Sequence, residues 1–64
     1  MNKVQKQSLI DWVVINPEGK VVAWIKKQRN PGGYVLEYKG IAGRWQDFYI
    51  TFSEAKQSAK TIEP

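Results

Sequence analysis

Ile15-Asn16-Pro17-Glu18-Gly19-Lys20 is the clearest turn signal in the chain. An Asn side chain can hydrogen-bond to the backbone that follows it, Pro presets φ near about −65°, and Gly accepts the positive φ that closes such a turn. Apolar and β-branched residues flank this stretch on both sides. The pattern predicts a β-hairpin built on a type I turn with a glycine bulge.

Working outward from this hairpin, two further turn signals divide the rest of the chain. They are Asn30-Pro31-Gly32-Gly33 and Gly40-Ile41-Ala42-Gly43. Together the three turns predict strands at about residues 8–15, 20–29, 34–39 and 44–52. Because links this short leave no room for a crossover, the strands must form an antiparallel meander.

A helix is expected after the last strand. Ser53 offers an N-cap oxygen, and Glu54 suits the positive end of a helix. Ala55, Ala59 and Ile62 share one helical face, which predicts a helix over residues 54–62. The predicted fold class is therefore α+β: a four-stranded antiparallel meander sheet with one short C-terminal helix packed on one face.

The chain has 64 residues, which is enough for one small domain. Residues 1–7 are mostly polar, so we expect a flexible N-terminal arm. Residues 8–64 are expected to form a single sheet-plus-helix domain.

The faces of the sheet follow from the expected register. Pairing Ile15 with Val21 places Trp12 directly opposite Trp24. In the second hairpin we expect Asn30 to pair with Gly33, and in the third Leu36 to pair with Phe48. The face expected beneath the helix then carries Leu9, Val13, Ile15, Val21, Ala23, Ile25, Tyr34, Leu36, Tyr38, Phe48, Ile50 and Phe52.

The opposite face of the sheet is expected to be open, aromatic and basic. Flat aromatic rings stack on bases, cationic side chains contact phosphates, and the net charge of +4 favours an anionic partner. We therefore expect a non-enzymatic protein that binds nucleic acid. The candidate site residues are Trp12, Trp24, Trp45 and Tyr49 for stacking, with Lys20, Lys26, Lys39 and Arg44 for phosphate contacts.

Two other interpretations of the aromatic residues remain open. The tryptophans could form the core, with the helix on their side, or a homodimer could close over them. Alternatively, the same aromatic face could dock on a protein partner, as in a small phage-type regulator or inhibitor. Small basic domains are also common, so the charge alone does not decide between these interpretations.

Several function classes are disfavoured by composition. The chain has no Cys and no His, so it lacks a disulfide framework, a thiol nucleophile and the usual zinc ligands, and we expect no metal and no cofactor. Among the carboxylates only Glu37 and Asp47 are expected to be neighbours, without a cleft to separate their pKa values. No apolar run approaches the length of a membrane span. We expect a cytoplasmic protein that is not an enzyme.

Two stretches carry a resemblance to known families. Ile50-Thr51-Phe52-Ser53-Glu54-Ala55, together with Gly19-Lys20-Val21-Val22, resembles the small single-strand-binding transcriptional coactivators. That likeness implies a curved four-stranded sheet followed by a helix, and dimers that bind melted DNA on the sheet. Gly19-Lys20, Ala23 and Ile25, followed by the helix start at Phe52, are also similar to the sheet-reading DNA-binding domains of the integrase arm-binding and plant ethylene-response types.

Overall fold

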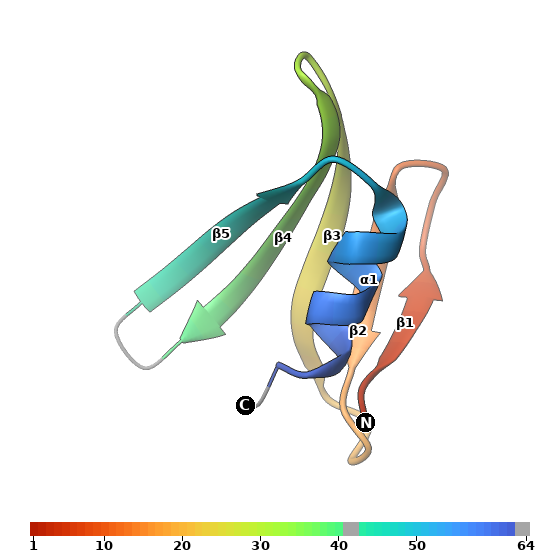
Figure 1. Ribbon diagram of the computed structural model, residues 1–64. Coiled ribbons are helices and arrows are strands. Elements are labelled where there is room, and N and C mark those ends of the chain that lie inside the picture. The colour runs from red at the N-terminus through yellow and green to blue at the C-terminus, as the bar shows by residue number, and fades with distance from the viewer. Residues whose placement is uncertain (41–42, 63–64) are drawn as a thin grey trace.

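The computed structural model describes residues 1–40 and 43–62, which form one antiparallel sheet followed by one helix (Figure 1). The α+β class, the meander and the C-terminal helix are confirmed, but the sheet has five strands in sequential order rather than four. The elements are β1 (Lys3–Lys6), β2 (Asp11–Ile15), β3 (Val21–Arg29), β4 (Gly32–Gly40), β5 (Gly43–Tyr49) and α1 (Phe52–Lys60). The central residues of the predicted turn over residues 40–43, and the last two residues of the predicted domain, lie outside the described residues.

The additional strand lies in the segment predicted to be a flexible arm. β1 pairs with β2, with Lys3 opposite Ile15. Asn2 is 8% exposed, and its side-chain amide donates to the carbonyl oxygens of Ala59 at 3.0 Å and Ile62 at 2.6 Å. The Ala59 carbonyl lies in the last turn of α1, and the Ile62 carbonyl lies two residues beyond the end of the helix. The N-terminus is therefore hydrogen-bonded to the C-terminal end of the helix. A contact between residues so far apart in the chain cannot be predicted from the polar composition of residues 1–7.

The first predicted turn is confirmed in its chemistry. Asn16 Oδ1 accepts the backbone N–H groups of Glu18 at 3.0 Å and Lys20 at 2.9 Å. Gly19 has φ +85°, which only glycine adopts readily. Asn16 is 5% exposed, so its side chain holds the turn from inside.

The register beyond this turn differs from the prediction. Ile15 does lie opposite Val21, but a bulge follows, and Trp12 lies opposite Ile25 instead of Trp24. One extra residue on β3 exchanges the faces of β2, because side chains alternate along a strand. Val14 therefore faces the helix, and the predicted pair of Trp12 with Trp24 does not form.

The second hairpin is shifted by two residues, which preserves its faces. Arg29 lies opposite Gly32, and Ile25 lies opposite Leu36, where the sequence predicted Asn30 opposite Gly33. Leu36 still shares the helix face with Ile25, as predicted.

The third hairpin is shifted by one residue, which exchanges the faces of β5. Leu36 lies opposite Asp47, and Phe48 lies opposite Val35 on the open face. A physical reason is the small size of Gly33: a Cβ there would overlap the Phe48 ring, so the ring occupies the space that glycine leaves.

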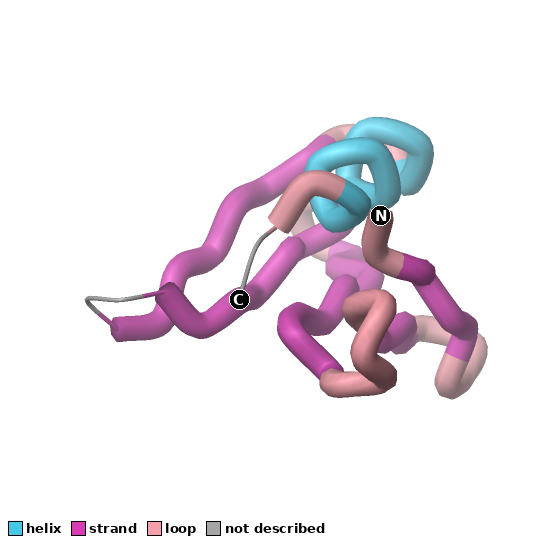
Figure 2. Tube along the Cα trace, turned by 90° about the horizontal axis from the view of Figure 1, so that it is seen from below, coloured by secondary structure: helices cyan, strands magenta, loops and turns pink. Residues whose placement is uncertain are grey.

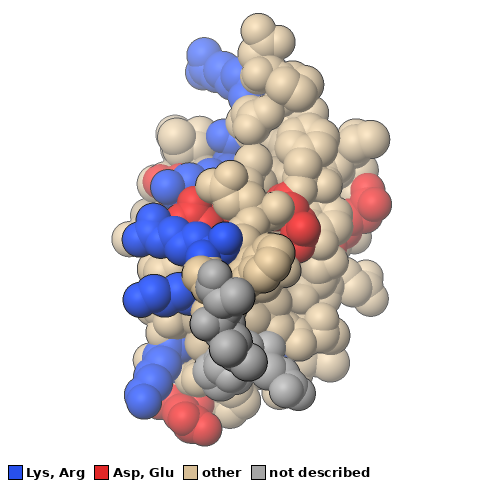
Figure 3. All heavy atoms as spheres, turned by 90° about the vertical axis from the view of Figure 1, so that its left-hand side faces the viewer, with Lys and Arg blue, Asp and Glu red and all other residues tan. Residues whose placement is uncertain are grey.

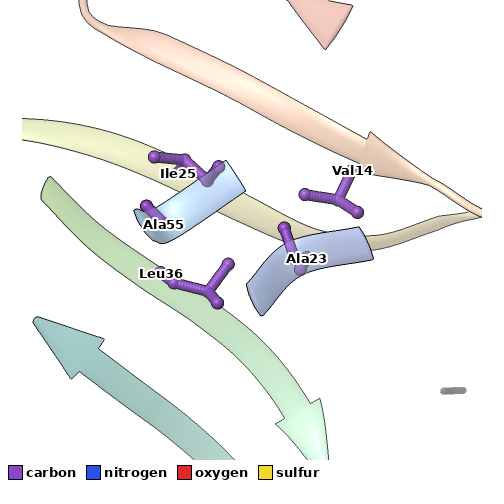
Figure 4. Close-up of a cluster of buried hydrophobic side chains, with 6 residues drawn as sticks. Val14, Ala23, Ile25, Leu36 and Ala55 are labelled. Atoms are coloured by element: carbon purple, nitrogen blue, oxygen red, sulfur yellow. The ribbon is translucent and has the colours of Figure 1, made fainter. Parts of the chain in front are cut away.

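The core lies between the sheet and α1, and Figure 2 shows the helix on one side of the strands. Figure 4 shows apolar side chains of β2, β3 and β4 converging on the alanine face of the helix. The buried residues are Val14, Ala23, Ile25, Leu36, Ala55 and Ala59. Several residues predicted for this core are instead exposed: Leu9, Val21, Phe48 and Ile50.

The helix begins earlier than predicted, at Phe52 rather than Glu54. Thr51, not Ser53, is the N-cap, and its Oγ1 accepts the backbone N–H of Glu54 at 3.3 Å. The helix comprises nine residues in the described chain, and no helix there is long and apolar enough to cross a membrane.

Candidate functional site

The predicted site residues do not share one face. Trp24, Lys26, Lys39 and Arg44 lie at sheet positions on the face away from α1. Lys20 is exposed in the link that enters β3. Trp12, Trp45 and Tyr49 occupy positions on the helix side. The pairing registers of β2 and β5 each differ by one residue from the prediction, and this exchanges which side chains of these strands face the helix. The predicted platform of three tryptophans on the open face is therefore wrong.

Trp12 has a packing role. Its ring lies 4.6 Å from that of Phe52 and 5.9 Å from that of Tyr34, measured between centroids. Edge-to-face and tilted aromatic pairs of this kind add to apolar burial. Trp12 thus packs against the start of α1, as the alternative with the tryptophans in the core expects, but Trp24 and Trp45, which that alternative also placed in the core, are exposed.

Trp45 and Tyr49 lie along the helix-facing side of β5. Trp45 is opposite Tyr38 and is 51% exposed, with its indole covering Gly40. Tyr49 is opposite Tyr34 and packs at the margin of the core. Trp45 is therefore an exposed ring on the wrong side of the sheet to act together with Trp24.

The open face nevertheless carries two accessible aromatic rings. Trp24 is 39% exposed and Phe48 is 46% exposed. Val13 and Val35 lie beside them, since they pair with Trp24 and Phe48 respectively. Sequence reasoning assigned Phe48 to the core; the signal that could have placed it outside is Gly33, the residue across the hairpin that leaves room for a ring.

The charged residues of the open face are mainly basic. Register places two carboxylates there, Asp11 and Glu37. The basic residues on this face are Lys3, Lys26, Lys39 and Arg44. The sequence did not place Lys3 on this face, because the segment that contains it was expected to be a flexible arm rather than a strand. Figure 3 views the molecule from the β5 side, and Lys and Arg side chains follow the margin that corresponds to the face away from α1.

Glu37 interacts with two neighbouring side chains. Arg44 lies 3.6 Å from it, the one salt bridge among residues 1–40 and 43–62, and Gln46 donates to it at 3.0 Å. Lys39 and Arg44 are directly opposite each other. Glu37 already offsets part of the Arg44 charge, whereas Lys39 has no carboxylate directly opposite it on β5.

On the helix side, a cleft of about 340 Å³ lies between α1 and the β4–β5 hairpin. It is bordered by Leu36, Tyr38, Asp47, Tyr49 and Ile62, among others. The Tyr38 hydroxyl donates to Asp47 Oδ2 at 3.2 Å. Partial burial, this hydrogen bond and the carboxylate charge raise the pKa of Tyr38 above its usual value. No group of three metal-ligating side chains occurs in the described part of the chain.

No protein-family model matches the sequence, and no curated protein and no solved structure matches the chain. The proposals below are therefore built from the geometry of the open face and of the sheet edges.

Proposed function

We propose that the protein is a non-enzymatic nucleic-acid-binding domain that uses the open face of its sheet. The proposed contact residues are Trp24 and Phe48 for bases, with Lys26, Lys39 and Arg44 for phosphates and Lys20 at the margin. The observation that carries the proposal is the pairing of Lys39 with Arg44 on the same face as an exposed tryptophan.

The arrangement of Trp24 and Lys26 supports stacking next to phosphate neutralisation. The two residues are separated by one position on β3, so their side chains lie on the same face about 7 Å apart. Lys26 is opposite Val35 on β4 and opposite Asp11 on β2, so it has a directly opposite carboxylate on one side only. A base on the indole would bring its phosphate within reach of the lysine.

Both carboxylates on this face lie beside a basic residue, so they repel an approaching phosphate less than unpaired carboxylates would. The charge of Glu37 is engaged by Arg44, and Asp11 lies opposite Lys26 at the far side of the face. The family resemblance to sheet-reading DNA-binding domains implies the same surface. A protein partner on this face is the alternative, but the basic residues beside the two exposed rings favour an anionic partner.

The test is fluorescence anisotropy of a dye-labelled oligo(dT) of about 12 nucleotides. A duplex of matched length is measured in parallel, each at about 50 mM and about 200 mM salt. We expect binding at low salt that weakens steeply at high salt, because cations are displaced from phosphates. Trp24→Ala is expected to weaken binding at least about fivefold, and Lys26→Ala is expected to reduce the salt slope by about one.

The chain offers a matched control for each variant. Trp45→Ala removes a tryptophan that is more exposed than Trp24 but lies on the helix side. Lys27→Ala removes the neighbouring lysine, whose position opposite Tyr34 is also on the helix side. Both controls are expected to bind like the unmodified protein. Absence of binding to both oligonucleotides at about 50 mM salt would refute the proposal, and equal losses in Trp24→Ala and Trp45→Ala would refute this choice of face.

A further inference from the structure

β5 is an edge strand whose outer side has no neighbour within the described chain. It is the last strand in the sheet order and pairs only with β4. Six of its seven residues are exposed. The backbone N–H and C=O groups along such an edge remain available for another strand.

The two edges of the sheet differ in how they are protected. β1 has four residues, begins and ends with lysine, and lies next to the anchored Asn2. Short length and lysines are usual protections against edge pairing. β5 has seven residues and carries the exposed rings of Trp45 and Phe48. Only the β5 edge therefore has the length and apolar character of a pairing edge.

We propose that β5 pairs antiparallel with β5 of a second copy of this chain. The register that overlaps all seven residues places Gln46 opposite Gln46 of the second copy, because Gln46 is the midpoint of the strand. Arg44 then lies opposite Phe48 of the second copy, which allows a cation–π contact. Trp45 lies opposite Asp47, so that an indole N–H donor meets a carboxylate.

Charge also argues against the neighbouring register that is centred on Asp47. Centring the pair on Asp47 would place two carboxylates directly opposite each other. Centring on Gln46 places no like charges opposite each other anywhere along the strand. The pairing is isologous, so it closes after two copies and does not propagate into a filament.

The consequence is one continuous sheet with both open faces on the same side. A two-fold axis perpendicular to a sheet exchanges the two copies without exchanging the faces of the sheet. The helices then lie together on the opposite side. The dimer would bring Trp24 and Lys26 of both copies onto the same side of one sheet, but its formation requires no nucleic acid and is tested without it.

The test uses the residue on the two-fold axis. Gln46→Lys and Gln46→Glu each place like charges opposite each other across the axis, and each is expected to weaken self-association about fivefold. Mixing the two variants brings the introduced lysine of one chain opposite the introduced glutamate of the other, so the mixture is expected to associate at least as well as the unmodified chain. Sedimentation velocity over about a hundredfold range of concentration measures each case, and near-ultraviolet circular dichroism establishes that each variant is folded.

The control is Gln5→Lys on the β1 edge, which is expected to leave association unchanged. The proposal is overturned if the unmodified chain is a monomer over the whole range. It is also overturned if Gln46→Lys associates like Gln5→Lys, or if the mixture of the two Gln46 variants associates no better than either variant alone.

Discussion

The two faces of the sheet use the same strands for different purposes. On β3, Ala23 and Ile25 are fully buried beneath α1, while Trp24 between them is exposed on the other face. Three of the six buried core residues are alanines: Ala23, Ala55 and Ala59. Small residues let the helix approach the sheet closely, and this displaces the large rings to the margins of the core and to the open face. The difference teaches that in a chain this short an aromatic ring is not by itself evidence of a core position.

The largest expected difference in stability between the two faces is at two adjacent residues of β3. Ile25→Ala leaves a cavity beneath the helix and is expected to lower the free energy of unfolding by about 2–5 kcal/mol. Trp24→Ala removes an exposed ring and is expected to cost less than about 1 kcal/mol. Urea denaturation followed by circular dichroism measures both. Equal losses would mean that the open face contributes to the core.

A second neighbouring pair tests the two faces at the start of β4. Gly33→Ala would drive a methyl group into the Phe48 ring and the Tyr49 carbonyl, and is expected to cost about 1–3 kcal/mol. Gly32→Ala meets only a distant backbone oxygen, so its effect is expected to stay within about 0.5 kcal/mol. Thermal unfolding of the two variants gives the comparison. A harmless Gly33→Ala would show that Phe48 does not lie over this glycine.

The smallest expected effect concerns the helix-side pair of Tyr38 and Asp47. Burial, the hydrogen bond and the carboxylate raise the pKa of Tyr38, so the folded state retains this proton when the unfolded chain has lost it. Stability is therefore expected to fall as the pH rises above about 10, through the range between the unfolded and folded pKa values. Asp47→Asn should move the phenol titration back toward its usual pKa.

Absorbance titration near the tyrosinate band measures this shift, with Asp11→Asn on the other face as the control. An Asp47→Asn titration curve identical to that of the unmodified protein would show that the hydrogen bond between Tyr38 and Asp47 does not form in solution.

The parts of the fold that were predictable are those with local causes. The Asn16 side chain and Gly19 define the first turn, short links force the antiparallel meander, and spaced alanines define the helix face. The candidate site was predicted less well. Trp24, Lys26, Lys39 and Arg44 lie on the open face as expected, whereas Trp12, Trp45 and Tyr49 do not.

The failures share one physical reason, which is that face assignment depends on register. A shift of one residue in β2 and in β5 exchanged every side chain on those strands, including the aromatic residues expected to stack. The alternation of apolar and polar residues on β2 and β5 is too weak to distinguish the two registers. The strand in residues 1–7 was missed because its stabilising contact, from Asn2 to the end of α1, spans nearly the whole chain.

By itself, the sequence determined the turns that follow β2 and β3, the antiparallel direction of the strands, and the short alanine-faced helix that follows them. Turn chemistry, link length and helical periodicity act over a few residues, so they can be recognised locally. Only the tertiary structure decided which side of each strand faces the helix, because the bulge after Val21 and the seating of Phe48 over Gly33 are settled by packing between distant residues.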